Sequence, residues 1–589
     1  MDVPLEQISI LWPGEKQGGF VDFSGCVEDL QLGELAGLVF PGRSAAEAMK
    51  FAFPLCTADP EVIAYRQAAI GDLLANPELM MVFERIRKLQ DEMRLCVTGI
   101  RENAEGFTSG GGMSGFKDTL EKLERLFGTK SNLIEESDLD NYYGQLFRAT
   151  IFSYRLSKAY VELLTLLREH LTEAACSSEA MKKLRRWVVE ICALDNVDSS
   201  IKVLEDIRKV WSGVGAFSVD ILVDRSLNVM GMELFSIQRD NYARSGVVTC
   251  RSGEDFDGIS ALTEFPMGGA TARFQECLMT ELGSALRNEL LKLRSMAGKI
   301  SVSAVQPLLN MTDEFDFYTG TARFCQKLME KGGSVAPATV SEDCFVDAEG
   351  CYPVALLLVH GESPTANDIR LPRGGRVNFV TGANSSGKTT WLITAGQLQW
   401  LYQLGCHLPC KSAKMSPVDG LYTLFASGES LSGEDSRMGM EAMKLAGFRE
   451  KMTENSMVLL NEPMTSTNAG EGIEICMDLL YELIERKVSG MIVTHYNELY
   501  AMLQKRLEPA GLLERLQSYV MEIDQENGVT RYPYRLRRRT PDRSSHADEI
   551  VRQVGVTLEA MLRRFAAAGL DVHPEDMAWE QLHAGEGEV

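Results

Sequence analysis

The chain has 589 residues, of which 45% are hydrophobic and 24% are charged, a composition typical of a folded protein with a sizeable core. No apolar run approaches the roughly 18 to 20 residues that a membrane-spanning helix requires, and the acidic N-terminus MDVPLEQISILWPGEK does not resemble a secretory signal. A net charge of −23 argues against a large nucleic-acid footprint but does not exclude a local basic patch.

The hydrophobic pattern predicts a multidomain α+β protein with four regions. A short N-terminal segment over 1–40 precedes a helical core or lever domain over 41–340, where apolar residues recur at three- and four-residue spacing, for example in 73–95, 142–171 and 181–210. A break is expected at Asn76-Pro77. Residues from about 216 to 272 alternate apolar and polar positions and indicate a small β insert.

The third region, over 341–545, has the texture of an α/β domain. Apolar segments that read as strands, YPVALLLVHG, RVNFV, MVLLNE and GMIVTHY, are separated by helical stretches. This alternation indicates a mostly parallel sheet covered on both faces. The remaining residues, 546–589, are expected to form a short C-terminal helical segment.

The cysteines and the basic clusters carry little functional signal. Thirteen cysteines are scattered without paired spacing, which favours reduced thiols and a cytoplasmic protein. Cys406 and Cys410 have the spacing of half a metal site, but no second half lies nearby, so two small buried side chains are the better interpretation. We interpret the basic clusters at 182–186 and 531–543 as solvated faces of a helix or strand.

The most informative motif lies around Thr381, where the chain reads NFVTGANSSGKTTW. Its pattern, Gly382-x4-Gly387-Lys388-Thr389, stands between an apolar strand and a helical stretch, the context of a phosphate-binding loop rather than of an ordinary glycine-rich turn. The glycines let backbone amides point at phosphates, and the helix start adds the positive end of its dipole. The motif predicts binding of a nucleoside triphosphate with magnesium. The candidate residues are Gly382, Ala383, Asn384, Ser385, Ser386, Gly387, Lys388, Thr389 and Thr390.

Two later strand ends supply groups that nucleotide hydrolysis requires. The strand over 457–460 ends in Asn461 and Glu462, of which Glu462 is the candidate for activating water. Asn461 stands where an Asp normally holds hydrated magnesium. Because Asn lacks the charge, we expect weaker Mg²⁺ binding, slower hydrolysis or both. His495 ends another strand, and it is either a sensor of the γ-phosphate or a packed core histidine.

Two polar loops are further candidates. The loop around Ser436, ESLSGEDSRMGME, runs into a helix. It is either a phosphate contact, including one to a nucleotide in a partner subunit, or a capped helix start. The segment Thr465-Ser466-Thr467 is either a subunit-contact loop or a plain polar turn.

These motifs together resemble the MutS family of DNA mismatch-repair ATPases. Five segments occur in the family's order and spacing: TGANSSGKTT, GCHLPCKSAKMSPVDGLYTLF, SLSGEDSRMGMEAM, VLLNEPMTSTNAGEG and VTHYNEL. The likeness covers roughly residues 45–565, strongly in the last 230 and faintly before them. The resemblance implies an ABC-like P-loop ATPase domain, ATP and Mg²⁺ as cofactors, and a homodimer with composite sites.

The resemblance also implies a role for each candidate residue. Lys388 and Thr389 would bind phosphate and magnesium, with Asn461 and Glu462 also at the metal. Glu462 would activate water and His495 would be the sensor. Ser436 would contact the γ-phosphate of the opposite subunit.

The chain departs from the family in ways that shape the expected function. A full mismatch-repair member carries two N-terminal domains, the first of which reads the mismatch, whereas the helical pattern here starts almost at the N-terminus. Phe274-Gln275-Glu276 matches the family's mismatch-reading tripeptide but lies in a helical pattern. Asn461 and Pro463 also differ from the family's pattern, which puts normal turnover in doubt.

We therefore expect an ATP-dependent, dimeric DNA clamp that acts in DNA repair or recombination without a mismatch-reading domain. The alternative is an ATP-driven conformational switch, or a low-turnover nucleotide-binding scaffold, that acts on protein partners rather than on DNA.

Overall fold

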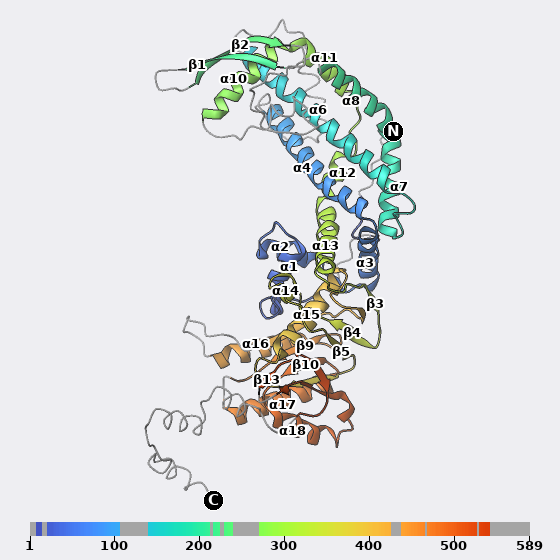
Figure 1. Ribbon diagram of the computed structural model, residues 1–589, viewed down its shortest axis with the longest axis vertical. Helices are drawn as coiled ribbons and strands as arrows, with labels where there is room; N and C mark the ends of the chain where they lie inside the picture. The colour runs from blue at the N-terminus through green and yellow to red at the C-terminus, as the bar shows by residue number, and fades with distance from the viewer. Residues whose placement is uncertain are drawn as a thin grey trace, which may run out of the picture. The chain divides into compact units, whose positions relative to one another are not determined.

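The computed structural model describes residues 8–14, 21–105, 139–211, 216–223, 229–238, 270–425, 437–465, 468–526 and 529–541 (Figure 1). The chain divides into two compact units. The helical unit comprises Met1–Gly14 and Gly71–Thr319, and the sheet unit comprises Glu15–Ile70 and Gly320–Val589. As the sequence predicts, helices combine with sheets in an α+β protein. The predicted domain boundaries stay predictions.

The helical unit is built around α6 (Leu139–His170), which packs against α4 (Pro77–Glu105), α10 (Ala270–Ala285) and α11 (Arg287–Ala297). The predicted break at Asn76-Pro77 is confirmed, because α3 (Pro60–Ala75) ends there and α4 begins. Apolar side chains at helical spacing fill the core between these helices and α8 (Val197–Trp211). They include Phe147, Ile151, Tyr154, Ile207, Leu278, Leu282, Leu286, Leu290 and Leu293.

Residues 181–210, which the sequence predicts as helical, form two helices, α7 (Glu179–Leu194) and α8 (Val197–Trp211). The break falls at Asp195 and Asn196, and Asn196 adopts a left-handed φ of 47°. The buried Asp195 carboxylate accepts hydrogen bonds from the hydroxyls of Ser301 and Ser303, each at 2.7 Å. A segment more than a hundred residues away thus stabilises the break. Beyond it come α12 (Val305–Asn310) and α13 (Thr312–Glu330).

A β-hairpin stands at the start of the predicted insert. β1 (Ala216–Val223) pairs antiparallel with β2 (Val229–Gln238), in agreement with the alternating pattern of this segment. α10 contacts β2 and contains the Phe274-Gln275-Glu276 tripeptide, so that tripeptide is helical. Residues 224–228 and 239–269 of the predicted insert lie outside the described residues, as do 546–589, where the C-terminal helical segment is predicted.

The sheet unit contains a six-stranded sheet. Its spatial order is β14 (Leu536–Arg538), β11 (Leu516–Met521), β6 (Val377–Thr381), β10 (Ser489–Val493), β9 (Met457–Asn461) and β8 (Leu421–Phe425). All are parallel except β14, which pairs antiparallel with β11. The carboxyl ends of the five parallel strands therefore meet at one edge.

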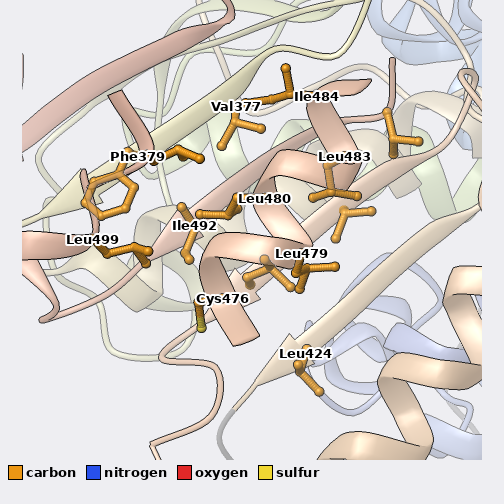
Figure 2. Close-up of a cluster of buried hydrophobic side chains, with 14 of the residues drawn as sticks. Val377, Phe379, Leu424, Cys476, Leu479, Leu480, Leu483, Ile484, Ile492 and Leu499 are labelled. Atoms are coloured by element: carbon orange, nitrogen blue, oxygen red, sulfur yellow. The ribbon is translucent and has the colours of Figure 1, made fainter. Parts of the chain in front are cut away.

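Helices cover both faces of this sheet, so β6, β8 and β10 are buried along their whole length. On one face, Leu479, Leu480 and Leu483 of α17 (Ala469–Glu485) pack over Val377 and Ile492 (Figure 2). α16 (Arg437–Lys451) and α18 (Asn497–Leu507) complete this core. α15 (Lys388–Leu404) contacts β9 and β10 and packs on the opposite face.

A smaller sheet has the order β3 (Ala338–Val340), β7 (Ser412–Met415), β4 (Cys344–Cys351) and β5 (Asn367–Pro372). The segment YPVALLLVHG, which we expected to be a strand, instead forms the short helix α14 (Val354–Leu358). Its buried residues, Val354 and Leu357, are three apart, as on one face of a helix. A short apolar run does not distinguish a strand from a buried helix, which explains the wrong prediction.

Residues 21–70 belong to the sheet unit. Asp22 bridges Gly420 next to β8, with the Leu421 N–H donating to the Asp22 carbonyl at 3.0 Å. The following elements are η1 (Ser24–Cys26), α1 (Leu32–Val39), α2 (Ala45–Ala52), η2 (Phe53–Leu55) and the start of α3. The remaining short elements are η5 (Leu513–Arg515) and the antiparallel pair β12 (Asp524–Glu526) and β13 (Val529–Arg531).

Candidate nucleotide site

The predicted phosphate-binding motif forms a loop over residues 382–387, which we call the glycine loop, between β6 and α15. Gly382 and Gly387 adopt φ values of +146° and +92°. A side chain is strained at such angles, so glycine is required there. Ser385 shares the left-handed region, at 64°. Because α15 begins at Lys388, its N-terminal amides and the positive end of its dipole lie directly behind the loop.

Lys388 folds back onto the glycine loop. Its Nζ donates hydrogen bonds to the carbonyls of Gly382 and Ala383, both at 2.9 Å, and the residue is 5% exposed. Burial lowers the pKa of the Lys388 ammonium, and the nearby Glu462 carboxylate opposes that shift. A lysine held in this way is a flexible point charge within reach of any anion on the loop.

The other loop residues divide into a buried and an exposed group. Ala383 and Ser386 are buried, and among the described residues the Ser386 hydroxyl has no hydrogen-bond partner. A Cβ on Gly382 would come within 3.2 Å of that hydroxyl oxygen, so only glycine keeps this cradle open. The exposed residues are Asn384, Ser385, Thr389 and Thr390.

Thr389 and Asn461, 72 residues apart, meet beside the loop. The Thr389 hydroxyl donates to Asn461 Oδ1 at 3.1 Å. Asn461 is the last residue of β9, and β10 separates β9 from β6, so the parallel sheet itself brings the two side chains to one edge. Two adjacent neutral oxygens are ligands that suit a hard cation such as Mg²⁺.

Glu462 begins a turn over residues 462–465, which we call the glutamate turn. The Glu462 Oε1 lies 2.7 Å from His495 Nε2, and the side chains are 20% and 42% exposed. The Glu462 N–H donates to the carbonyl of Val493 at 2.8 Å, which fixes the turn to the end of β10. The structure thus brings together a carboxylate and a histidine that the sequence analysis proposed separately, and the histidine side chain is exposed rather than packed in the core.

The structure adds two residues that the sequence analysis missed, Tyr534 and Asn367. A Cβ on Gly387 would lie 3.1 Å from the Tyr534 ring, so this ring stands against the glycine loop. Tyr534 has a left-handed φ of 56° and is 47% exposed. Asn367 holds this position with two hydrogen bonds of 2.8 Å, donating to the Tyr534 carbonyl and accepting from the Leu536 N–H. No motif or spacing in the sequence marks either residue.

Several predicted candidates are not part of the described site. Ser436, Ser466 and Thr467 lie outside the described residues. Cys406 and Cys410 are both buried, and the described part of the chain contains no cluster of three or more His, Cys, Asp or Glu side chains suited to a metal ion. Among the helices of that same part, none is both long and apolar enough to cross a membrane.

The basic cluster at 182–186 lies on α7, outside the sheet unit, and its side chains already have partners. Lys182 pairs with Glu179, and Arg185 pairs with Glu173. These contacts agree with a solvated helix face.

Comparison with known proteins matches residues 378–560 to the family described as MutS domain V. The DNA mismatch repair protein MutS of Brevibacillus brevis is 29% identical over 227 residues, or 37% of this chain and 24% of that protein. The MutS of Caulobacter sp. is 31% identical over 187 residues, or 30% and 20%. The MutS of Lysinibacillus sphaericus is 23% identical over 269 residues, or 45% and 29%. The chain thus spans less than a third of the length of these relatives.

The matched region begins within β6 and contains the glycine loop, the glutamate turn and His495. The likeness therefore falls on the part of the molecule that carries the convergent polar groups. The similarity to MutS domain V thus covers residues 378–560 of the chain.

Proposed function

We propose that the sheet unit binds ATP with Mg²⁺ and hydrolyses it. The observation that carries this proposal is the convergence of Lys388, the Thr389–Asn461 pair and the Glu462–His495 pair at the carboxyl edge of one parallel sheet. Ligands of open α/β sheets bind at this edge.

The glycine loop would hold the phosphates. Its backbone amides and the α15 N-terminus supply hydrogen-bond donors, and Lys388 supplies the charge for the β- and γ-phosphates. The Ser386 hydroxyl, which is buried and has no partner among the described residues, is a further donor. The Tyr534 ring beside Gly387 would border the bound nucleotide.

Thr389 and Asn461 would hold the magnesium ion, with Glu462 next to them. Bound there, Mg²⁺ would supply positive charge beside the phosphates. Both oxygens of the pair are neutral, and an Asp at 461 would add a full negative charge. We therefore expect slow turnover relative to an Asp-containing site.

Glu462 would act as the general base. One carboxylate oxygen faces His495, which orients it, and the other accepts a proton from water as the water oxygen attacks the γ-phosphorus. The bond from the γ-phosphorus to its bridging oxygen then breaks, and ADP and phosphate leave. His495 would report the state of the γ-phosphate through its contact with Glu462.

Within the MutS family, this site would drive a dimeric clamp on DNA that acts in repair or recombination, with Ser436 completing the site of the opposite subunit. The names of the matched relatives, DNA mismatch repair proteins, support the DNA part of this proposal. A low-turnover switch or scaffold on protein partners is the second candidate. Asn461 and the net charge of −23 favour it.

The test uses the full chain with a fluorescent ATP analogue and a phosphate-release assay. We expect Lys388→Ala to weaken nucleotide binding about 100-fold or more, since it removes the phosphate-facing charge. We expect Glu462→Ala to keep binding within about threefold but to lower hydrolysis at least about 100-fold. Lys505→Ala, an exposed lysine on α18, is the control. Loss of ATP affinity in Glu462→Ala would contradict the assigned role.

The DNA part is tested separately by gel shift at low salt. Duplex, mismatched, branched and single-stranded DNA are compared with and without ATP. Binding to at least one of them is expected, and binding to none would leave the protein-partner alternative as the better function.

A further inference from the structure

The glutamate turn is strained in two places. Glu462 and Met464 adopt left-handed φ values of 52° and 60°, although neither is glycine. Each such residue costs about 1–3 kcal/mol. Pro463 stands between them and restricts the backbone of Glu462 further. A turn of this kind persists only where neighbouring elements fix it.

Three elements of the sheet unit fix this turn. β10 accepts the Glu462 N–H through the Val493 carbonyl at 2.8 Å. On α17, the Cys476 thiol donates to the Pro463 carbonyl at 3.6 Å, a weak bond. On α16, the Glu441 carboxylate accepts the Met464 N–H through Oε2 at 3.0 Å.

The Glu441 bond differs from the other two because it joins a carboxylate to a backbone amide in the interior. Glu441 is 3% exposed and Met464 is 1% exposed. Loss of a buried acceptor leaves the amide unsatisfied, so the bond to Met464 is the strongest constraint on the far side of Glu462. Burial raises the pKa of the Tyr496 phenol, and the charges of Glu462 and Glu441 add to that rise.

We propose that Glu441 is a positioning residue for hydrolysis. This inference rests on the proposed function, ATP hydrolysis by the sheet unit. By holding Met464 in its left-handed conformation, Glu441 fixes the direction in which the chain leaves Glu462. The Glu462 carboxylate then stays against His495 and toward the γ-phosphate. Without that bond the strained turn relaxes, and a displacement of about 1 Å is enough to cost a reaction about 100-fold.

Two substitutions of Glu441 separate the effect of its side-chain length from the effect of its charge. Glu441→Gln keeps the length of the side chain and an acceptor oxygen but removes the charge. Glu441→Asp keeps the charge but is one methylene too short to reach the Met464 amide. For Glu441→Asp we expect kcat to fall about 10- to 100-fold, with the dissociation constant of the ATP analogue within about threefold. For Glu441→Gln we expect kcat within about threefold of the wild type.

A double-mutant cycle adds a readout that a merely structural residue would not move. If Glu441 acts through Glu462, the effect of Glu441→Asp on kcat disappears in a Glu462→Gln background. An undiminished effect there would overturn the proposal. So would a loss of kcat in Glu441→Gln, or wild-type kcat in Glu441→Asp.

Folding and function are kept apart by two controls. Thermal unfolding is recorded for each variant, and if Glu441→Asp does not fold, a loss of kcat in a folded Glu441→Gln still overturns the proposal. If the wild type neither binds nor hydrolyses ATP, the proposed function fails. If the wild type turns over and the two variants do not rank as expected, only the role of Glu441 fails.

Discussion

The glycine loop and the glutamate turn lie at the same edge of one sheet, yet they reach left-handed backbone by different means. The glycine loop places glycine at two of its positive-φ positions, 382 and 387. The glutamate turn uses Glu462 and Met464, and hydrogen bonds from β10 and α16 hold them. The first is a local property of the chain, and the second is imposed by neighbouring elements. Four predictions test this difference, from the largest expected effect to the smallest.

Gly382→Ala tests whether the glycine loop is fixed by backbone geometry. A Cβ there would lie 2.9 Å from the Met521 Cβ at a φ of +146°. We expect the free energy of unfolding to fall by about 2–3 kcal/mol, and ATP affinity to fall at least about tenfold. Gly374→Ala is the matched control, because its φ is +84° but no atom lies within 4 Å. Equal costs in denaturant unfolding would contradict the role of the close approach.

Asn461→Asp tests whether the metal-facing group limits turnover. The added carboxylate next to Thr389 should raise the Mg²⁺ affinity, and with it kcat at low Mg²⁺, about tenfold. A Mg²⁺ titration of phosphate release measures this. Asn461→Leu, which has a similar shape without the oxygen, should shift the titration the other way. An unchanged titration in both variants would remove Asn461 from the site.

Asn367→Ala tests how far the glycine loop depends on a distant contact. It removes two hydrogen bonds that fix the Tyr534 position, each worth about 1 kcal/mol. We expect ATP affinity to fall about 3- to 10-fold, since a loss of about 1 kcal/mol of binding free energy raises the dissociation constant about fivefold. Asn367→Asp can accept from Leu536 but cannot donate to Tyr534. Its ATP affinity should therefore lie between those of the wild type and Asn367→Ala. Wild-type affinity in Asn367→Ala would mean that the loop is held locally.

The pH dependence of ATP affinity couples the two segments. Burial lowers the pKa of Lys388 below its usual 10.5, and Glu462 opposes this. The charged ammonium binds phosphate, so affinity is full below the lowered pKa and is lost as the pH rises through it. Glu462→Gln removes the opposing charge and should move the midpoint to lower pH. The ATP affinity of Lys388→Arg should not change over the same pH range, because the guanidinium stays charged. A midpoint that moves up in Glu462→Gln would contradict the coupling.

Local patterns made much of the site predictable. Gly382, Lys388, Asn461, Glu462 and His495 all sit at strand ends or in a strand–loop–helix motif, and parallel strands bring their ends together. The roles assigned to these residues, and to Ser436, stay predictions.

Residues that act across the fold left no such signal. In the sequence, nothing distinguishes Glu441 from the other polar residues of its helix, although its side chain is buried. Asn367 and Tyr534 likewise lie in ordinary polar stretches of the sequence. Their contacts depend on the register of β5, β14 and α16, which no periodicity encodes. The break at Asp195 is similar, because serines from a later segment stabilise it. The prediction of a strand at α14 was wrong for another reason, because a run of five apolar residues fits either a strand or a helix.

The contacts between residues 21–70 and the rest of the sheet unit determine which fragment of the chain can be isolated. A recombinant piece cut at 341–545 would lose the Leu30 carbonyl that accepts from Gln397 and the Thr57 carbonyl that accepts from Gln403, at 2.9 and 3.2 Å. Both amides are buried, and the end of β8 would lose its pairing with Asp22. An uncovered strand edge promotes aggregation. A soluble fragment would have to carry 21–70 as well, joined to it by a linker.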